Sequence, residues 1–400
     1  MIADTLLIPF ILLLVCGMKF SNSENNYFFD DYLSPQNTKV LKGIFAVTVV
    51  VYHLGMLTNN VGSKILIYCS GDFAVKFFFF CSGYGLLTQY KKYQARGADY
   101  TKGFLSKHLP KLLVPLLVLT IIYTLFFINE GFYYGRPSFT FNLVVDLFLN
   151  NGFYVVYNAW FVFELLLLYI VFFLSFRFGK KNGGVFCCVI FTLVLMCAFY
   201  MLSTYKEWTN FWYYSTFAFA VGVIYAEYKE NIDTFLKKHF KAVTYILFPM
   251  LICTMIAFFA IKKGTENKAG ITSAENIVLT PLFLLSLMAL LTKVQPGCKK
   301  IWSFIGEISY ELYLVHGLMY LLLYTSDSST ESQFIFSFGV MALSIVAAII
   351  IHYIDFVILK IYFLIYNLFH KNIKMMLYIL NKKKTGIKNT VEWYKEQNNG

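Results

Sequence analysis

Charged residues are scarce in this sequence. They make up 14% of its 400 residues, whereas hydrophobic residues make up 58%. The mean hydropathy is +0.61, which implies more apolar surface than a soluble domain of this length could bury. Apolar runs long enough to cross a hydrocarbon layer of about 30 Å recur from the N-terminus to beyond residue 355. The composition therefore excludes an ordinary soluble protein and predicts an all-α, polytopic transmembrane helix bundle.

Several catalytic and metal-binding motifs are also missing. The eight cysteines form no C-x-x-C pair and lie mostly in apolar runs, where they act as small apolar residues. Neither the cysteine nor the histidine spacing suits zinc, so we expect no metal site. The sequence has no Walker-type P-loop and no G-x-S-x-G elbow. The candidates for function are therefore the few polar residues inside the apolar runs.

The hydropathy pattern predicts about eleven spans, one at the N-terminus followed by ten that form a core. The first apolar run lacks a basic n-region and an A-x-A-like cleavage site, so we expect it to remain as an uncleaved span. The predicted spans are 4–18, 40–57, 66–87, 109–128, 158–176, 185–203, 211–227, 243–261, 277–292, 303–324 and 334–357.

Two other apolar stretches contain polar interruptions. Asp146 and Asn150 break the stretch 141–157, which indicates a loop or a re-entrant segment buried in protein. His370 and Lys371 interrupt residues 359–380, which favours a helix lying in the membrane interface.

Basic residues gather in alternate connections between the spans. Of the 34 Lys and Arg residues, 27 fall in segments that this pattern assigns to the cytoplasmic side. Because Lys and Arg are retained on that side, we expect the N-terminus and the loop 325–333 outside and the C-terminus inside. The net charge of +12 is then explained by basic residues that set the membrane topology and contact anionic lipids. We therefore expect a lipid bilayer, and no nucleic acid, as a partner.

The first informative polar pair lies in LKGIFAVTVVVYHLG, residues 41–55. Lys42 and His53 are eleven positions apart, which puts them on one helix face about 16.5 Å apart along the axis. Lys42 is also explained as a topology charge at the membrane surface, and His53 as an interfacial histidine near a helix end.

This pair resembles the signature of the acyltransferase-3 family of membrane acyltransferases. The first core helix of that family carries a basic residue, more often Arg, and after ten intervening positions a His that is regarded as catalytic. The resemblance implies that His53 is a catalytic base and that Lys42 contacts the acyl donor.

Two further segments resemble the same family. GDFAVKFFFFCSGYGLL, residues 71–87, is similar to its acidic-then-aromatic helix, with Asp72 as a candidate catalytic group and Lys76 and Ser82 as cavity-lining candidates. Asp72 and Lys76 are spaced i,i+4, so a purely structural ion pair is equally open. FLSKHLPKLLVP, residues 104–115, places Lys107 and Lys111 where they could hold the phosphates of coenzyme A, or serve as ordinary cytoplasmic charges.

The remaining resemblance lies in two later helices. NAWFVFELLLLYIVFF contains Glu164, a lone carboxylate at membrane depth that needs a partner. In IGEISYELYLVHGLMY, Ser309, Tyr313 and His316 share one helix face. We expect these four residues to line the substrate cavity, with direct catalysis or a core role as alternatives for His316. We also expect Asp72, His53 and His316 to converge on one water-accessible cavity.

The resemblance implies a domain organisation and a reaction. Residues 38–357 would form the ten-helix acyltransferase domain, 1–37 an N-terminal span and cytoplasmic linker, and 358–400 an interfacial helix and basic tail. The implied activity transfers an acyl group, expected to be acetyl, from acyl-CoA to a hydroxyl of a cell-surface glycan or lipid-linked saccharide in the bacterial cytoplasmic membrane. Acetyl-CoA or another acyl-CoA would be a donor substrate and not a resident cofactor.

A different class of protein remains open on the sequence alone. A flippase, polymerase or transporter of lipid-linked saccharides would also combine many spans with a polar interior. Transporters of this kind often contain internal repeats, and the two halves of this sequence show none.

Overall fold

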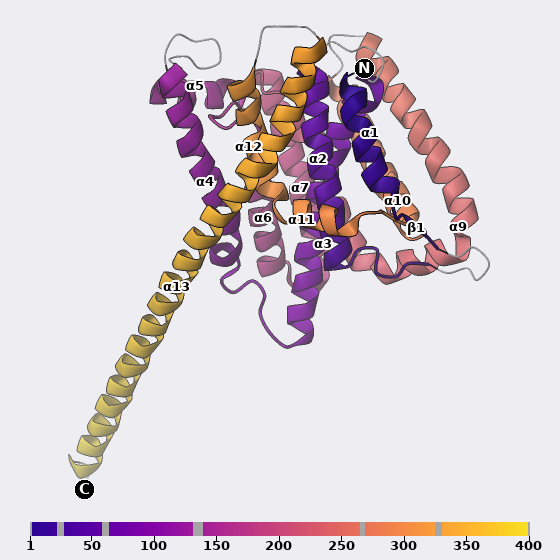
Figure 1. Ribbon diagram of the computed structural model, residues 1–400. Helices are drawn as coiled ribbons and strands as arrows, with labels where there is room; N and C mark the ends of the chain where they lie inside the picture. The colour runs from indigo at the N-terminus through magenta and orange to yellow at the C-terminus, as the bar shows by residue number, and fades with distance from the viewer. Residues whose placement is uncertain are drawn as a thin grey trace. The chain divides into compact units, whose positions relative to one another are not determined.

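The computed structural model describes residues 2–21, 28–57, 64–130, 139–264, 269–324 and 330–398. Nearly all of the described chain is helical (Figure 1). It divides into two compact units, Met1–Ile351 and His352–Gly400. The helices are α1 Ile2–Val15, α2 Pro35–Leu57, α3 Lys64–Ala95, α4 Phe104–Glu130, α5 Phe141–Asn151, α6 Trp160–Phe178, α7 Lys180–Tyr205, α8 Phe211–Tyr214, α9 Phe217–Gly264, α10 Ala269–Leu291, α11 Lys299–Glu307, α12 Ser309–Leu323 and α13 Thr330–Asn398.

Within the described residues, six helical segments are long and apolar enough to cross a membrane. The predicted helical membrane architecture is therefore confirmed, while the number of eleven spans stays a prediction. One of the six, Phe211–Ala257, contains the predicted span 211–227 and most of the predicted span 243–261. The six segments are Pro35–Met56, Phe104–Glu130, Trp160–Phe178, Gly183–Tyr205, Phe211–Ala257 and Phe334–Phe369.

The structure corrects the sequence prediction at several breaks. The span predicted at 303–324 is two helices, α11 and α12, because the backbone leaves helical geometry at Ile308. The spans predicted at 211–227 and 243–261 are joined through α9, which changes direction at Tyr228 and His239 (Figure 1). Most of the predicted loop 325–333 lies outside the described residues.

Two segments are more regular than the sequence indicated. The stretch predicted as a loop or re-entrant segment contains α5, an 11-residue helix whose first turn is capped by the hydroxyl of Thr140. It ends at Gly152, where φ is +69°. The predicted interfacial helix 359–380 is no separate element, since α13 runs through it. Residues 340–385 contain neither proline nor glycine, so no residue there ends the helix.

The N-terminal helix is tied to the chain around residue 297. β1 (Lys19–Phe20) pairs in antiparallel fashion with β2 (Val294–Gln295). The backbone N–H of Gly297 donates to the carbonyl of Leu14 at 2.8 Å. The indole N–H of Trp302 donates to the carbonyl of Leu13 at 3.3 Å. These contacts connect the end of α1 to α11.

The segments predicted to share the cytoplasmic side do lie together. Asp99 pairs with Arg177, which joins the segment before α4 to the end of α6. Further contacts join the chain just before α2 and its first turn to later basic residues: Lys237 with Asp30 at 2.6 Å, and Lys299 with Asn37 at 3.0 Å. These contacts bring connections from distant parts of the chain together, while the orientation of the protein in the membrane stays a prediction.

Helices α3 and α9 approach each other through two glycines. A Cβ atom on Gly83 would lie 2.2 Å from the carbonyl oxygen of Phe219, and one on Gly222 would lie 2.2 Å from that of Phe80. Small residues allow such close backbone contact between membrane helices. This packing fixes the position of α3 along α9, and with it the positions of Phe78 and Ser82 on α3.

We expect Gly83→Ala to destabilise the protein by about 1–3 kcal/mol, because the added methyl group must push two backbones apart. Gly85→Ala on the same helix is the matched control, since a Cβ there meets nothing within 4 Å. The measurement is the thermal unfolding midpoint of both variants in detergent. Equal midpoints for Gly83→Ala and Gly85→Ala would show that the close contact does not hold these helices.

Candidate active site

Two histidines from distant parts of the sequence meet inside the bundle. His53 lies near the end of α2, and His316 lies in the middle of α12. Nδ1 of His53 is 3.0 Å from Nε2 of His316, and the ring centroids are 5.0 Å apart. His316 is completely buried, whereas His53 is partly exposed. His53 is therefore the one of the two that a substrate can reach directly.

Backbone and amide groups fix the ring of His316. Its Nδ1 lies 3.1 Å from the carbonyl oxygen of Leu312, one helical turn earlier. Its Nε2 lies 3.1 Å from the side-chain nitrogen of the buried Asn158, just before α6. Tyr320, one turn later on α12, donates to the carbonyl of Val50 at 3.0 Å and so joins α12 to α2. Helices α2 and α12 and the loop before α6 thus converge on the histidine pair.

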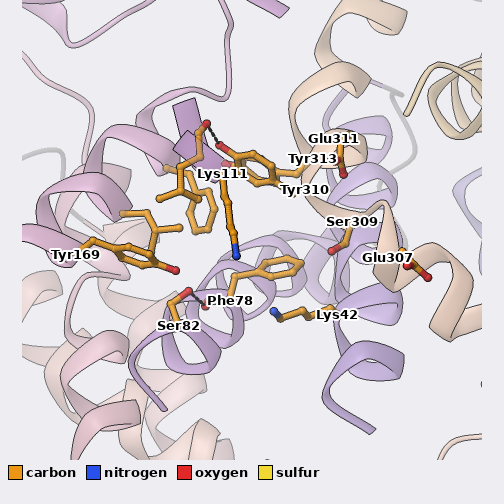
Figure 2. A pocket seen from close by; sticks show the side chains of 13 residues that line it. Lys42, Phe78, Ser82, Lys111, Tyr169, Glu307, Ser309, Tyr310, Glu311 and Tyr313 are labelled. Atoms are coloured by element: carbon orange, nitrogen blue, oxygen red, sulfur yellow. Dashed lines mark hydrogen bonds between the residues drawn. The ribbon is translucent and has the colours of Figure 1, made fainter. Parts of the chain in front are cut away.

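A cavity of about 270 Å³ lies toward the N-terminal ends of α2, α4 and α12. Figure 2 shows the amines of Lys42 and Lys111 directed toward the same space, beside Phe78, Ser82 and Ser309. Lys111 is exposed and Lys42 is partly buried, so both charges can meet a ligand that enters from solvent. The lining residues are Lys42, Phe78, Ser82, Lys111, Leu112, Phe161, Leu165, Tyr169, Glu307, Ser309, Tyr310, Glu311 and Tyr313.

Tyr313 links this cavity to the histidines. It lines the cavity, and its ring centroid lies 5.9 Å from that of His316 on the same helix. Its ring also packs against Phe161 at a centroid distance of 5.0 Å. Lys42 and His53 lie at different heights along α2. On α12, Tyr313 contacts both the cavity that Lys42 lines and the ring of His316.

Lys107 was predicted beside Lys111 as a phosphate ligand, but it is not among the residues that line the cavity. Its side chain is exposed, and it lies four residues, about one turn, before Lys111 on α4. Only the later lysine of the pair is directed into the cavity (Figure 2).

Asp72 and Lys76 form a separate cluster on α3. Lys76 is completely buried, pairs with Asp72 and donates to the amide oxygen of Asn276 at 2.8 Å. Asp72 also accepts a hydrogen bond from Ser215 at 3.1 Å. Within the described part of the chain, neither Asp72 nor Lys76 contacts His53 or His316. The cluster joins α3, α10 and the connection between α8 and α9, as a structural ion pair would.

Glu164 is completely buried on α6. Neither carboxylate oxygen has a hydrogen bond of acceptable geometry within the described residues, although the hydroxyl of Thr216 lies near enough to interact. The next residue on α6, Leu165, lines the cavity, whereas Glu164 itself does not. Glu164 therefore lies behind the cavity wall and not in the wall itself.

Two groups at the site carried no recognisable signal in the sequence. Asn158 is the first residue of the segment NAWFVFELLLLYIVFF, and nothing in its spacing connected it with His316. The backbone carbonyls of Leu312 and Val49, which both contact the histidine rings, have no side-chain signature at all. No group of three or more His, Cys, Asp or Glu side chains within the described residues is arranged to hold a metal ion.

The fold and this site define a membrane-embedded protein with a polar cavity and, next to the cavity residue Tyr313, a pair of histidines. Neither His53 nor His316 is among the residues that line this cavity, so the structure does not bring Asp72, His53 and His316 together on it. The chain matches the family described as "Acyltransferase domain" (Acyl_transf_3) over residues 37–353. The protein therefore belongs to the acyltransferase-3 family, and the resemblance seen in its motifs is confirmed. Searches of curated proteins and of solved structures found no match.

Proposed function

We propose that this membrane acyltransferase transfers an acyl group, with acetyl favoured, from acyl-CoA to a hydroxyl of a cell-surface glycan or lipid-linked saccharide. The observation that carries the proposal is the cavity lined by two lysines and by Tyr313, whose ring lies next to that of His316 in the His53–His316 pair. Lysines suit the phosphates of coenzyme A, and a histidine suits proton removal from a hydroxyl.

The proposed donor enters from the end of the bundle where the basic segments meet. Lys42 and Lys111 would contact phosphate groups of coenzyme A, while the hydroxyls of Ser82 and Ser309 offer hydrogen bonds to the pantetheine amides. Because coenzyme A is cytoplasmic, this end would face the cytoplasm, with the N-terminus of the chain outside and the C-terminus inside a bacterial cytoplasmic membrane.

His53 would act as the general base in the transfer. It takes the proton from the acceptor hydroxyl while that oxygen bonds to the thioester carbonyl carbon. The tetrahedral intermediate then collapses, the C–S bond breaks, and the thiolate of coenzyme A leaves and receives the proton from His53. The products are an ester of the acceptor and free coenzyme A, so no other reactant is needed.

The direct test uses purified protein in lipid nanodiscs with radiolabelled acetyl-CoA and a pool of bacterial glycans and lipid-linked saccharides. We expect label to enter an ester that mild alkali releases, with one coenzyme A formed per ester. A reporter fused after Gly400 should remain cytoplasmic in the same cells. If no acyl-CoA tested labels any acceptor, while lipid-linked saccharides cross the bilayer of reconstituted vesicles, the protein is a flippase and the proposal is wrong.

A further inference from the structure

We infer that Asn158 and His316 are positioning residues that hold His53 in its Nδ1–H tautomer, so that Nε2 of His53 is the nitrogen that accepts the proton. This inference rests on the proposed function in one respect: the group that gives its proton to His53 is taken to be the acceptor hydroxyl. The tautomer itself follows from the hydrogen bonds around the pair.

The chain of hydrogen bonds starts at the backbone of α12. A carbonyl oxygen can only accept a hydrogen bond, so the contact between Leu312 and Nδ1 of His316 requires a hydrogen on that nitrogen. A neutral imidazole carries one N–H, which leaves Nε2 of His316 as an acceptor. Complete burial favours this neutral form of His316 because a buried charge loses its hydration.

Nε2 of His316 then receives two donors. The side-chain nitrogen of Asn158 is 3.1 Å away, and Nδ1 of His53 is 3.0 Å away. Since the acceptor carries no hydrogen, Nδ1 of His53 must carry one. The lone pair of His53 is therefore on Nε2.

The amide of Asn158 determines which of the two histidines holds the transferred proton. When His53 takes a proton at Nε2, its Nδ1–H still donates to His316. If that hydrogen moved on to His316, the new N–H would face the N–H of Asn158, and two donors would point at each other. Asn158 thus keeps the proton on His53, from which it returns to the leaving thiolate. The same two donors occupy the only lone pair of His316, so His316 is not the base.

The tautomers can be observed without any acyl transfer, by two-bond ¹⁵N–¹H correlation spectra of the ¹⁵N-histidine-labelled full chain in detergent. The sequence has six histidines, and assignment follows from the signal lost in each His→Gln variant. We expect His53 and His316 both in the Nδ1–H form. His108 is an internal reference outside the site, because its Nδ1 lies 2.8 Å from the carbonyl of Phe104. An Nε2–H pattern for His53 overturns the inference.

Variants separate positioning from catalysis and from packing. His316→Gln keeps an oxygen that can accept from Nδ1 of His53, whereas His316→Leu does not. We expect kcat to fall about 10²-fold in His316→Leu and at most about tenfold in His316→Gln, at an unchanged KM for acyl-CoA. Equal losses in both variants contradict the inference.

Asn158→Asp replaces the donor with a carboxylate that only accepts. We expect His316 to become doubly protonated in the spectrum and kcat to fall about 10²-fold, because His316 can then no longer accept from His53. An unchanged His316 pattern rejects the role of Asn158. If wild type transfers no acyl group yet shows the expected tautomers, the proposed function fails while the geometry of the pair stands.

Discussion

We expect His53→Ala to lower acyl transfer by about 10²- to 10⁴-fold, which is the usual contribution of a general base. The partly exposed His53 is the member of the pair that a substrate can reach, whereas His316 is completely buried. Removing one histidine changes the apolar character of α2 little, so the variant should still insert into the membrane. The measurement is the rate of labelled ester formation, with the amount of folded protein determined by size-exclusion chromatography.

His108→Gln is the matched control for this experiment. His108 is a partly buried histidine at the start of α4, hydrogen-bonded to Tyr100 and to the carbonyl of Phe104, and it contacts neither member of the pair. Its replacement should leave kcat within about twofold of wild type, because no group at the site loses a partner. Near-normal turnover in folded His53→Ala would exclude His53 as the base.

The second large effect concerns the acyl donor. We expect Lys111→Ala to raise the KM for acyl-CoA about tenfold or more, because a hydrogen bond to a charged group contributes about 1.5–3 kcal/mol. Its amine points into the cavity, next to that of Lys42 (Figure 2). The effect should shrink as ionic strength rises, since Lys111 is exposed and its charge is screened by salt.

Lys107→Ala provides a closely matched control. Lys107 and Lys111 are both exposed lysines on α4, one turn apart, and only Lys111 lines the cavity. If both residues served only to orient the helix in the membrane, the two variants would behave alike. Lys42→Ala should resemble Lys111→Ala, whereas Lys42→Arg should be tolerated, because it keeps the charge and adds donors. A KM that is equal in Lys107→Ala, Lys111→Ala and wild type would remove the lysines from donor binding.

Much of this protein follows from its sequence alone. Scarce charge and repeated apolar runs predicted a helical membrane protein, because unpaired backbone groups cannot remain in lipid. The eleven-residue spacing of Lys42 and His53 placed them on one helix face, and the structure has both on α2. These inferences succeed because each depends on residues close together in the chain.

Other features were decided by tertiary structure. The contact between His53 and His316 joins residues 263 positions apart, and no local pattern encodes it. Asp72 pairs with Lys76 and Ser215 and contacts neither histidine, because its side chain faces the connection between α8 and α9, while Lys76 meets α10. The break at Ile308, which separates α11 from α12, likewise interrupts a run whose hydropathy alone is typical of one span.

The clearest contrast is between Lys107 and Lys111. The sequence determined that both lie near the start of one helix and carry the same charge. Because residues four apart share a helix face, which of them reaches the cavity depends on how far the start of α4 extends along α2, α3 and α12, and that position is set by side-chain packing between helices. In the same way, the sequence determined that Asn158 is a polar residue at a helix start, while only the folded bundle placed its amide 3.1 Å from His316. Periodicity along a chain fixes the face of a helix, but the partner of that face is fixed by contacts between residues far apart in sequence.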